Sequence, residues 1–155
     1  MFGNDGIAAY IKSASTVMSC PAVVPVFARC MAAQCKASEL FYLDAPISGG
    51  AIKAAAGKLS VMASGEPAAF SGARMALDAI AETVFELGDE AGAGSAMKAV
   101  NQLLAGVHIA AMAEAMTFGI SHGIAADVIV DVFSQCAGTS WMFENRPPPV
   151  VRCEY

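Results

Sequence analysis

The chain has 155 residues, enough for one ordinary domain or for parts of two, and 56% of them are hydrophobic while only 15% are charged. A net charge of -5 without any lysine and arginine run argues against nucleic-acid binding, which usually requires a basic patch. Five scattered cysteines without C-x-x-C spacing predict neither a disulfide framework nor a zinc site, and the N-terminus lacks a signal-peptide pattern. We therefore expect a cytoplasmic protein.

The first ninety residues alternate between segments typical of strands and segments typical of helices. After a loop and short helix at residues 3–11, short apolar runs bounded by Pro, Gly or Ser predict strands at residues 16–19, 40–44, 58–63 and 83–87. Helices are expected at residues 27–36, 51–56 and 66–81, the last with Pro67 at its first position. Pro21 and Pro25 should mark the end of the first strand, and Pro46 with Ser48-Gly49-Gly50 should end the second.

Residues 92–122 predict one long helix that begins at Gly94 or Ser95, with Ser95 as its cap. No formal charge occurs between residues 98 and 114, and apolar residues cover nearly every direction around the helix. We therefore expect other parts of the protein to bury it on most sides. A membrane span is the alternative, disfavoured because the uncharged run has only about fifteen residues and a bilayer requires about 20.

The organisation changes at Gly92, from alternating strands and helices to helices alone. Further helices are expected at residues 125–136 and 141–146, and the proline run 147–149 should stop the second. The predicted fold class is α/β followed by all-α. The predicted domains are residues 1–91 and residues 92–155.

Three polar residues, Lys98, Asn101 and Gln102, stand at i, i+3 and i+4 near the start of the long helix and share one face. The positive end of the helix dipole and partial burial both disfavour the ammonium form of Lys98. Both effects lower its pKa toward the range that is useful for proton transfer. The alternative is a lysine that extends to solvent beside two packing amides, and the spacing alone favours neither.

Two glycine motifs and two histidines are candidates for ligand binding. Ser48-Gly49-Gly50 at the end of a strand can direct backbone N–H groups and a hydroxyl at an anion, although a plain turn fits as well. Gly92-Ala93-Gly94 resembles the start of a dinucleotide fingerprint, but Met97 stands where the third glycine belongs, so we reject it as a cofactor loop. His108 and His122 have no acidic or cysteine partner at ligand spacing, and no metal site is expected.

Two motifs in this order carry a family resemblance: D-A-P-I-S-G-G at residues 44–50 and G-A-G-S-A-M-K-A-V-N-Q at residues 92–102. Together they resemble the β-hydroxyacid dehydrogenase family, which includes 3-hydroxyisobutyrate dehydrogenase. The segments Q-L-L-A-G-V-H-I-A-A-M-A-E-A-M and A-G-T-S-W-M-F-E-N-R most closely resemble its L-threonate dehydrogenase branch, and the similarity covers essentially the whole chain. The resemblance implies part of a nicotinamide-binding Rossmann domain, a long interdomain helix and the start of a helical domain.

The resemblance also implies roles for particular residues. Lys98 would be the catalytic lysine that handles the hydroxyl proton, and Ser48-Gly49-Gly50 would hold the substrate carboxylate. Asn101 and Gln102 would orient the substrate, and NAD or NADP would accept the hydride. Family members commonly have Asn-Asn where this chain has Asn101-Gln102, so the longer second amide suits a different substrate.

Three departures from the family pattern concern the cofactor. No G-x-G-x-x-G loop occurs in these residues, so the pyrophosphate lacks its usual helix N-terminus. Pro21-Ala22-Val23 replaces the family's Ser-Thr-Val, which leaves Ala22 as a weak cofactor-binding position without a hydroxyl. The chain also ends at Tyr155, before the family's late lysine motif. We therefore expect a fragment of a longer dehydrogenase that is inactive by itself.

These observations support two hypotheses of different classes. The first is an NAD(P)-dependent dehydrogenase of a small hydroxy acid, such as the four-carbon L-threonate, with 3-hydroxyisobutyrate dehydrogenase or tartronate semialdehyde reductase activity as alternatives. The second is a non-catalytic remnant that acts only in association. For the full-length protein we expect a homo-oligomer with a small-acid substrate and with neither nucleic-acid nor membrane partners.

Overall fold

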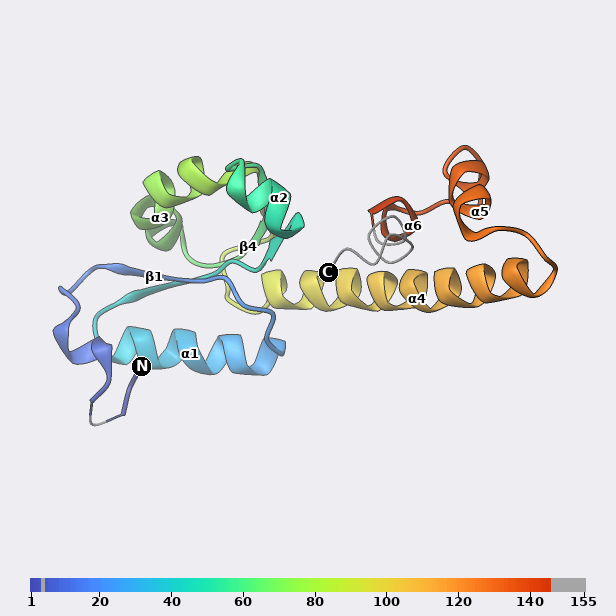
Figure 1. Cartoon of the computed structure of the whole chain (residues 1–155). Coiled ribbons are helices and arrows are strands. Elements are labelled where there is room, and N and C mark those ends of the chain that lie inside the picture. Colours follow the sequence, from blue (N-terminus) through green and yellow to red (C-terminus); the bar gives the residue numbers. More distant parts are fainter. Residues whose placement is uncertain (4, 146–155) are drawn as a thin grey trace. The chain divides into compact units, whose positions relative to one another are not determined.

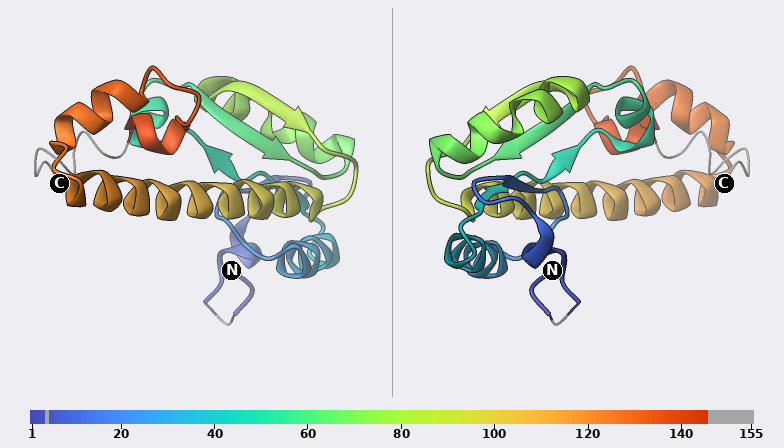
Figure 2. Two further views of the ribbon diagram at one scale, coloured as in Figure 1. Left: turned by 90° about the vertical axis from the view of Figure 1, so that its right-hand side faces the viewer. Right: turned by 90° about the vertical axis from the view of Figure 1, so that its left-hand side faces the viewer.

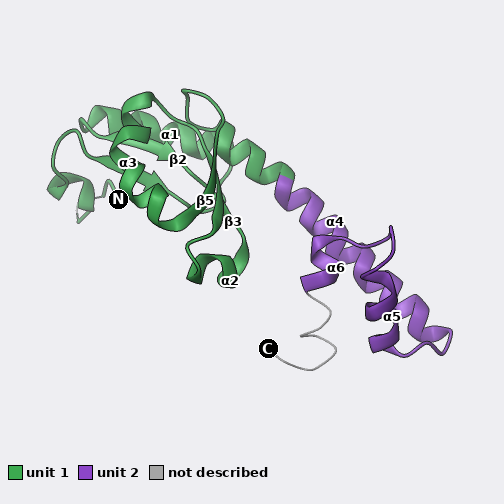
Figure 3. Cartoon of the chain, turned by 90° about the horizontal axis from the view of Figure 1, so that it is seen from above, with its two compact units in different colours: residues 1–100 green, residues 101–155 purple. Residues whose placement is uncertain are grey.

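The computed structural model describes residues 1–3 and 5–145. Its contacts divide the chain into two compact units, Met1–Val100 and Asn101–Tyr155, which Figure 3 colours green and purple. Helix α4 (Ala93–Ser121) contributes residues to both units, and each unit is described by itself below.

The first unit is a partial Rossmann-like α/β region, as the sequence predicts. Its strands are β1 (Thr16–Ser19), β2 (Phe41–Asp44), β3 (Ile47–Ser48), β4 (Leu59–Ala63) and β5 (Ala81–Glu86). Its helices before α4 are the short 3-10 helix η1 (Ile7–Tyr10), α1 (Pro25–Ala37), α2 (Gly50–Ala55) and α3 (Pro67–Ile80). Strand β1 pairs with β2 in parallel, β4 pairs with β5 in parallel, and the bridge Asp44↔Ser64 connects the two sheets.

Helices α1 and α3 cover opposite faces of the strands, as Figures 1 and 2 show. Successive side chains of a strand point to opposite faces, and β2 shows this at two adjacent buried residues. Leu43 packs with Ala69 and Ala73 of α3, whereas Tyr42 packs with α1. This two-sided burial explains why residues 41–43 are continuously apolar or aromatic, as expected for a parallel strand covered by helices.

One local expectation is wrong. Strand β3 lies where the sequence predicts only a break, because Ile47 and Ser48 pair in antiparallel with Val61 and Ser60 of β4. Pro25 follows the end of β1, as expected, and also occupies the first turn of α1, where its missing N–H costs nothing.

The second unit contains α4 from Asn101 onward, α5 (Ala126–Phe133) and α6 (Trp141–Asn145). Ile129 of α5 and Phe143 of α6 are its buried large apolar residues among those described. The helix expected at residues 125–136 is present with shorter bounds, and the helix expected at residues 141–146 is present over its described residues. Residue 146 and the proline run that should stop the last helix lie outside the described residues.

The expectation that α4 is buried on most sides is wrong for the described structure. Of its 29 residues, all described, only Gly94 and Ser95 are buried. Leu103 is 68% exposed and Phe118 is 69% exposed. By length and composition the helix is also long and apolar enough to cross a membrane, although Asn101, Gln102 and His108 interrupt its apolar sequence. The mostly buried core helix of a globular protein passes the same test.

Candidate active site

A buried carboxylate, Asp44, fixes the start of α4. Asp44 ends β2 and has no exposed surface. Its Oδ2 accepts the N–H groups of Gly92 at 3.0 Å and Ser95 at 2.8 Å, and its Oδ1 accepts the Ser95 hydroxyl at 2.7 Å. Asp44 thus caps a helix from 51 residues earlier in the chain. Its negative charge also lies at the positive end of the helix dipole, which stabilises it there.

Ser64, which follows β4, completes this cluster. The Ser64 hydroxyl accepts the N–H of Gly94 at 3.0 Å and lies 3.5 Å from Asp44 Oδ2. The backbones of Ser64 and Asp44 also exchange two hydrogen bonds, of 3.0 and 2.8 Å. Asp44, Ser64 and Ser95, all completely buried, therefore form a closed polar cluster between two strand ends and α4.

The glycines of the Gly92-Ala93-Gly94 motif allow this close approach. Gly92 has φ +110°, a conformation that side chains rarely adopt. A Cβ atom at Gly94 would collide with the carbonyl oxygen of Met62 and would lie 2.8 Å from that of Asp44. The motif in this structure packs a helix start against strand ends.

The prediction that Ser95 caps the long helix is wrong. Helix α4 begins at Ala93, so Ser95 lies inside the first turn, and its hydroxyl donates to Asp44. The residue that accepts the N–H groups of Gly92 and Ser95 is Asp44, for which the sequence predicts no such role. The available signal is an aspartate at the end of a predicted buried strand, because a buried carboxylate requires hydrogen-bond donors.

Lys98, the predicted catalytic residue, lies in α4 three residues after Ser95. Its side chain is partly buried, and this burial lowers the pKa of the ammonium group from its ordinary value. The direction agrees with the prediction for a lysine that exchanges protons.

Asn101 and Gln102 lie further along α4, and the contact division places them in the second unit. The Asn101 Nδ2 donates to Gln102 Oε1 at 3.2 Å. Asn101 is partly buried and Gln102 is exposed, so both amides have surface available to a ligand.

The Ser48-Gly49-Gly50 turn links β3 to α2 in the first unit. Gly49 has φ +138° and Gly50 has φ +68°, which explains two consecutive glycines. Gly49 is the N-cap of α2 and makes no side-chain cap hydrogen bond. The N–H groups of the first turn of α2 therefore lack intrahelical partners and point outward from the helix end.

The residues after β1 could contact only part of a nicotinamide cofactor. Pro21 and Ala22 are exposed and carry no side-chain donor, and Pro21 also lacks a backbone N–H. The predicted cofactor-binding position at Ala22 therefore offers a nicotinamide no side-chain hydrogen bond.

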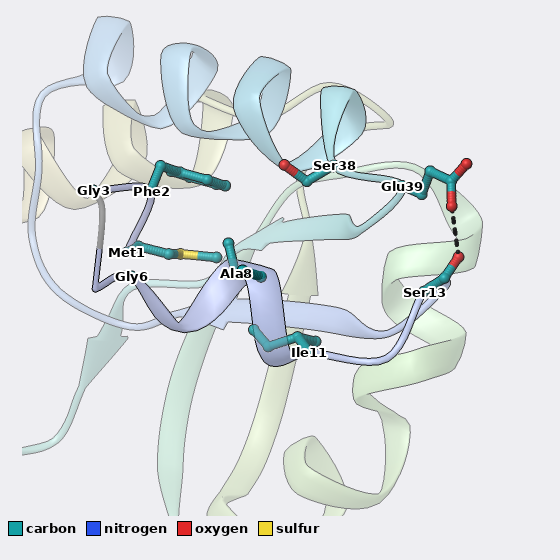
Figure 4. Close-up of a pocket in the computed structure, with 10 residues that line it drawn as sticks. Met1, Phe2, Gly3, Gly6, Ala8, Ile11, Ser13, Ser38 and Glu39 are labelled. Atoms are coloured by element: carbon teal, nitrogen blue, oxygen red, sulfur yellow. Dashed lines mark hydrogen bonds between the residues drawn. The ribbon is translucent and has the colours of Figure 1, made fainter.

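Three pockets of the described structure contain none of the predicted site residues, and one of them, of about 700 Å³, lies between α3 and β5. Another, of about 440 Å³, lies between the N-terminal segment and the end of α1, where Ser13 Oγ donates to Glu39 Oε2 at 3.1 Å (Figure 4). The third, of about 410 Å³, lies within the second unit beside His108. Among the described residues, no three His, Cys, Asp or Glu side chains gather as a metal site would require.

Comparison with known families gives two matches that together cover most of the chain. Residues 1–88 match the family described as the NAD binding domain of 6-phosphogluconate dehydrogenase. Residues 92–155 match the family described as NAD-binding of NADP-dependent 3-hydroxyisobutyrate dehydrogenase.

Individual relatives agree with these matches. The L-threonate dehydrogenases of Cupriavidus necator and Escherichia coli are each 46% identical over the whole chain, which covers 52% and 51% of their lengths. The 3-hydroxyisobutyrate dehydrogenase of Pseudomonas aeruginosa is 35% identical over 94% of the chain and 49% of its own length. The chain thus spans about half the length of the curated relatives it matches.

Solved structures extend the similarity to three dimensions. The crystal structure of 3-hydroxyisobutyrate dehydrogenase from Salmonella typhimurium is 50% identical with a TM-score of 0.94, over 97% of this chain and 53% of that one. Psf3 in complex with NADP⁺ and 2-OPP is 27% identical with a TM-score of 0.89, over 97% of this chain and 52% of that one. The chain therefore belongs to the 3-hydroxyisobutyrate dehydrogenase family of NAD(P)-binding β-hydroxyacid dehydrogenases, with L-threonate dehydrogenases among its relatives.

Proposed function

We propose that the protein containing this chain oxidises a small hydroxy acid with NAD or NADP, and that its substrate is L-threonate or a similar four-carbon sugar acid. The observation that carries the proposal is the partly buried Lys98, whose pKa is lowered by burial, on a helix start held by a buried carboxylate. The 46% identity to L-threonate dehydrogenases supports the substrate class.

Each predicted residue has a separate task in this proposal. Lys98 in its neutral form would accept the proton of the substrate hydroxyl, which burial favours by lowering its affinity for a proton. The N–H groups of the Ser48-Gly49-Gly50 turn would bind the carboxylate. The amides of Asn101 and Gln102 would orient the remaining hydroxyl groups. A bound nicotinamide would supply the hydride acceptor.

The test replaces Lys98 in a complete enzyme, made by adding the flanking segments of the Escherichia coli L-threonate dehydrogenase to both sides of this chain. Lys98→Ala should lower kcat for the hydroxy acid by about 10²-fold or more, as loss of a general base does. The matched control is Lys58→Ala, since Lys58 is exposed. Turnover by Lys98→Ala close to that of the control would refute the proposed role.

The turn is tested by Gly49→Val in the same enzyme. A Cβ atom at Gly49 would lie 2.8 Å from Lys53 Cβ, and its φ of +138° disfavours any side chain. The KM for the hydroxy acid should rise much more than the KM for NAD or NADP. Ala51→Val, at an exposed position of α2, is the control. Weaker cofactor binding with an unchanged KM for the acid would mean that the turn binds the cofactor and that the proposed ligand is wrong.

A second candidate is a non-catalytic protein that acts only in association, and Pro21 and Ala22 favour it because they provide no hydroxyl to a nicotinamide. Calorimetric titration of the 155-residue chain with NAD and NADP bears on both candidates. We expect no saturable binding, because these residues contain no G-x-G-x-x-G loop.

For the complete protein, we propose a homo-oligomer in the cytoplasm.

A further inference from the structure

We propose that Asp44 is a positioning residue, which sets the place of Lys98 relative to the Ser48-Gly49-Gly50 turn. This inference rests on the proposed function, because it gives these two features a common reaction. Asp44 itself is completely buried and would not touch the substrate.

The side chain of Asp44 determines where the first turn of α4 lies. Its three hydrogen bonds to Gly92 and Ser95 are 2.7 to 3.0 Å long, and each joins a charged acceptor to a donor, which makes them stronger than neutral bonds. Lys98 follows Ser95 by three residues, less than one helical turn. A shift or rotation of Ser95 therefore moves Lys98 directly.

The backbone of Asp44 determines where the substrate turn begins. Asp44 is bridged to Ser64, and the two residues that follow it, Ala45 and Pro46, are buried. The Pro46 carbonyl accepts the N–H of Met62 at 2.9 Å, so the segment from Asp44 to Ser48 follows β4. Ser48 is only four residues from Asp44, which leaves little freedom between them.

One residue thus connects both halves of the proposed site. The turn is joined to Asp44 by three residues of hydrogen-bonded backbone, and Lys98 is joined to Asp44 by the first turn of a helix. The glycine at position 94 permits this contact because its missing Cβ leaves room for the Asp44 carbonyl. Reaction rates depend steeply on such geometry, since a misplacement of about 1 Å can cost 10²-fold.

Two substitutions separate hydrogen bonding from charge. Asp44→Ala removes all acceptors. Asp44→Asn removes the charge but keeps a carbonyl oxygen for the two N–H groups, and its amide can donate to the Ser95 hydroxyl, which can also accept. If Asp44 acts by positioning through these bonds, the Asn variant should recover most of the activity that the Ala variant loses.

The experiment uses the completed enzyme described above and measures kcat per folded molecule, KM and Tm. We expect Asp44→Ala to lower kcat per folded molecule by about 10²-fold, with little change in the KM for the cofactor. Leu77→Ala, a core substitution in α3, is the matched control, because it lowers Tm without touching either element of the site. A purely structural role for Asp44 would lower Tm and leave kcat per folded molecule unchanged, as in the control. That outcome, or an Asn variant as impaired as the Ala variant, would overturn the inference.

A second measurement distinguishes failure of the inference from failure of the proposed function. If the completed enzyme oxidises no hydroxy acid, the proposed function fails. Amide hydrogen exchange in the 155-residue chain then tests whether Asp44 holds the start of α4 and the segment before the turn in place. Asp44→Ala should accelerate exchange at Ser95, whose N–H donates to Asp44, and at Met62, whose N–H donates to the Pro46 carbonyl in the segment that leads to the turn. Asp44→Asn should largely restore protection at both. Asp127→Ala, at the first turn of α5, should change neither. Unchanged exchange at Ser95 or at Met62 in Asp44→Ala would overturn the inference.

Discussion

The burial of two stretches of α4 is the opposite of what their composition predicts. The first stretch, residues 93–98, contains a glycine, a serine and a lysine, yet it includes the only buried residues of the helix. The later stretch, residues 103–121, is almost entirely apolar, yet large side chains such as Leu103 and Phe118 are more than two-thirds exposed. Hydrophobicity therefore does not by itself determine which part of a helix is buried.

The difference arises from what each stretch contacts. The first has partners for its backbone N–H groups, because Asp44 and Ser64 accept them. The later stretch satisfies its own backbone within the helix, and within the described residues little apolar surface covers its side chains. Polar complementarity buries a helix start, whereas an apolar surface becomes buried only where a second apolar surface is present.

The largest expected effect comes from one substitution made in each stretch. Gly94→Ala should destabilise the 155-residue chain by about 3 kcal/mol, because the added Cβ meets the Met62 carbonyl oxygen and rigid backbone must move. Gly106→Ala should instead stabilise it by about 1 kcal/mol, because no atom lies within 4 Å of its Cβ position and alanine favours a helix. Urea unfolding followed by circular dichroism measures both.

Equal effects of the two substitutions would contradict the comparison. A stable Gly94→Ala variant would show that the start of α4 is not packed against the strand ends. A strongly destabilised Gly106→Ala variant would show that the later stretch is covered in the isolated chain.

The elements of the fold could largely be predicted because their signals are local. Apolar runs between Pro, Gly and Ser identified the strands, and Pro67 marked the start of α3, each within a few residues of the observed bounds. Strand β3 was missed because two residues carry no periodic pattern, and it depends on pairing with β4. Local patterns do not encode such pairing.

The candidate site could be predicted only in part. The roles that the resemblance implies for Lys98 and Ser48-Gly49-Gly50 stay predictions, and the partial burial that lowers the pKa of Lys98 agrees with the expected direction. Asp44 was not recognised because its contacts join residues 48 and 51 positions apart, and no helical or strand spacing relates them. The exposure of α4 was mispredicted because composition indicates a preference for burial but not the presence of a covering surface.

A smaller effect concerns association of the isolated chain. The exposed apolar side chains of the later stretch should make the 155-residue chain self-associate, as large exposed apolar patches do. The double substitution Leu103→Lys and Phe118→Lys should reduce the mass measured by light scattering. Met75→Lys is the control, because Met75 is 87% exposed but lies on α3. A monomeric unsubstituted chain, or an equal effect of the control, would contradict this expectation.

The smallest expected effect is a pH dependence at the start of α4. Burial lowers the pKa of Lys98 from its ordinary value of 10.5, so the unfolded chain holds this proton more tightly than the folded chain does. Below the lowered pKa the fold therefore carries the full cost of a desolvated ammonium, and stability rises as the pH increases from the lowered pKa toward 10.5. Lys98→Met removes this contribution.

The measurement compares urea unfolding of the unsubstituted chain and the Lys98→Met chain between about pH 8 and pH 11, where lysine side chains titrate. Burial raises the pKa of the Tyr42 phenol, which lowers stability as the pH rises past its ordinary value of 10.0. Because Tyr42 is present in both proteins, its contribution cancels in the difference between them. The Lys98→Met chain should be the more stable of the two at pH 8, and its advantage should shrink as the pH increases. An advantage that stays constant across this range, or that grows with pH, would mean that burial at the start of α4 does not disfavour the charged lysine.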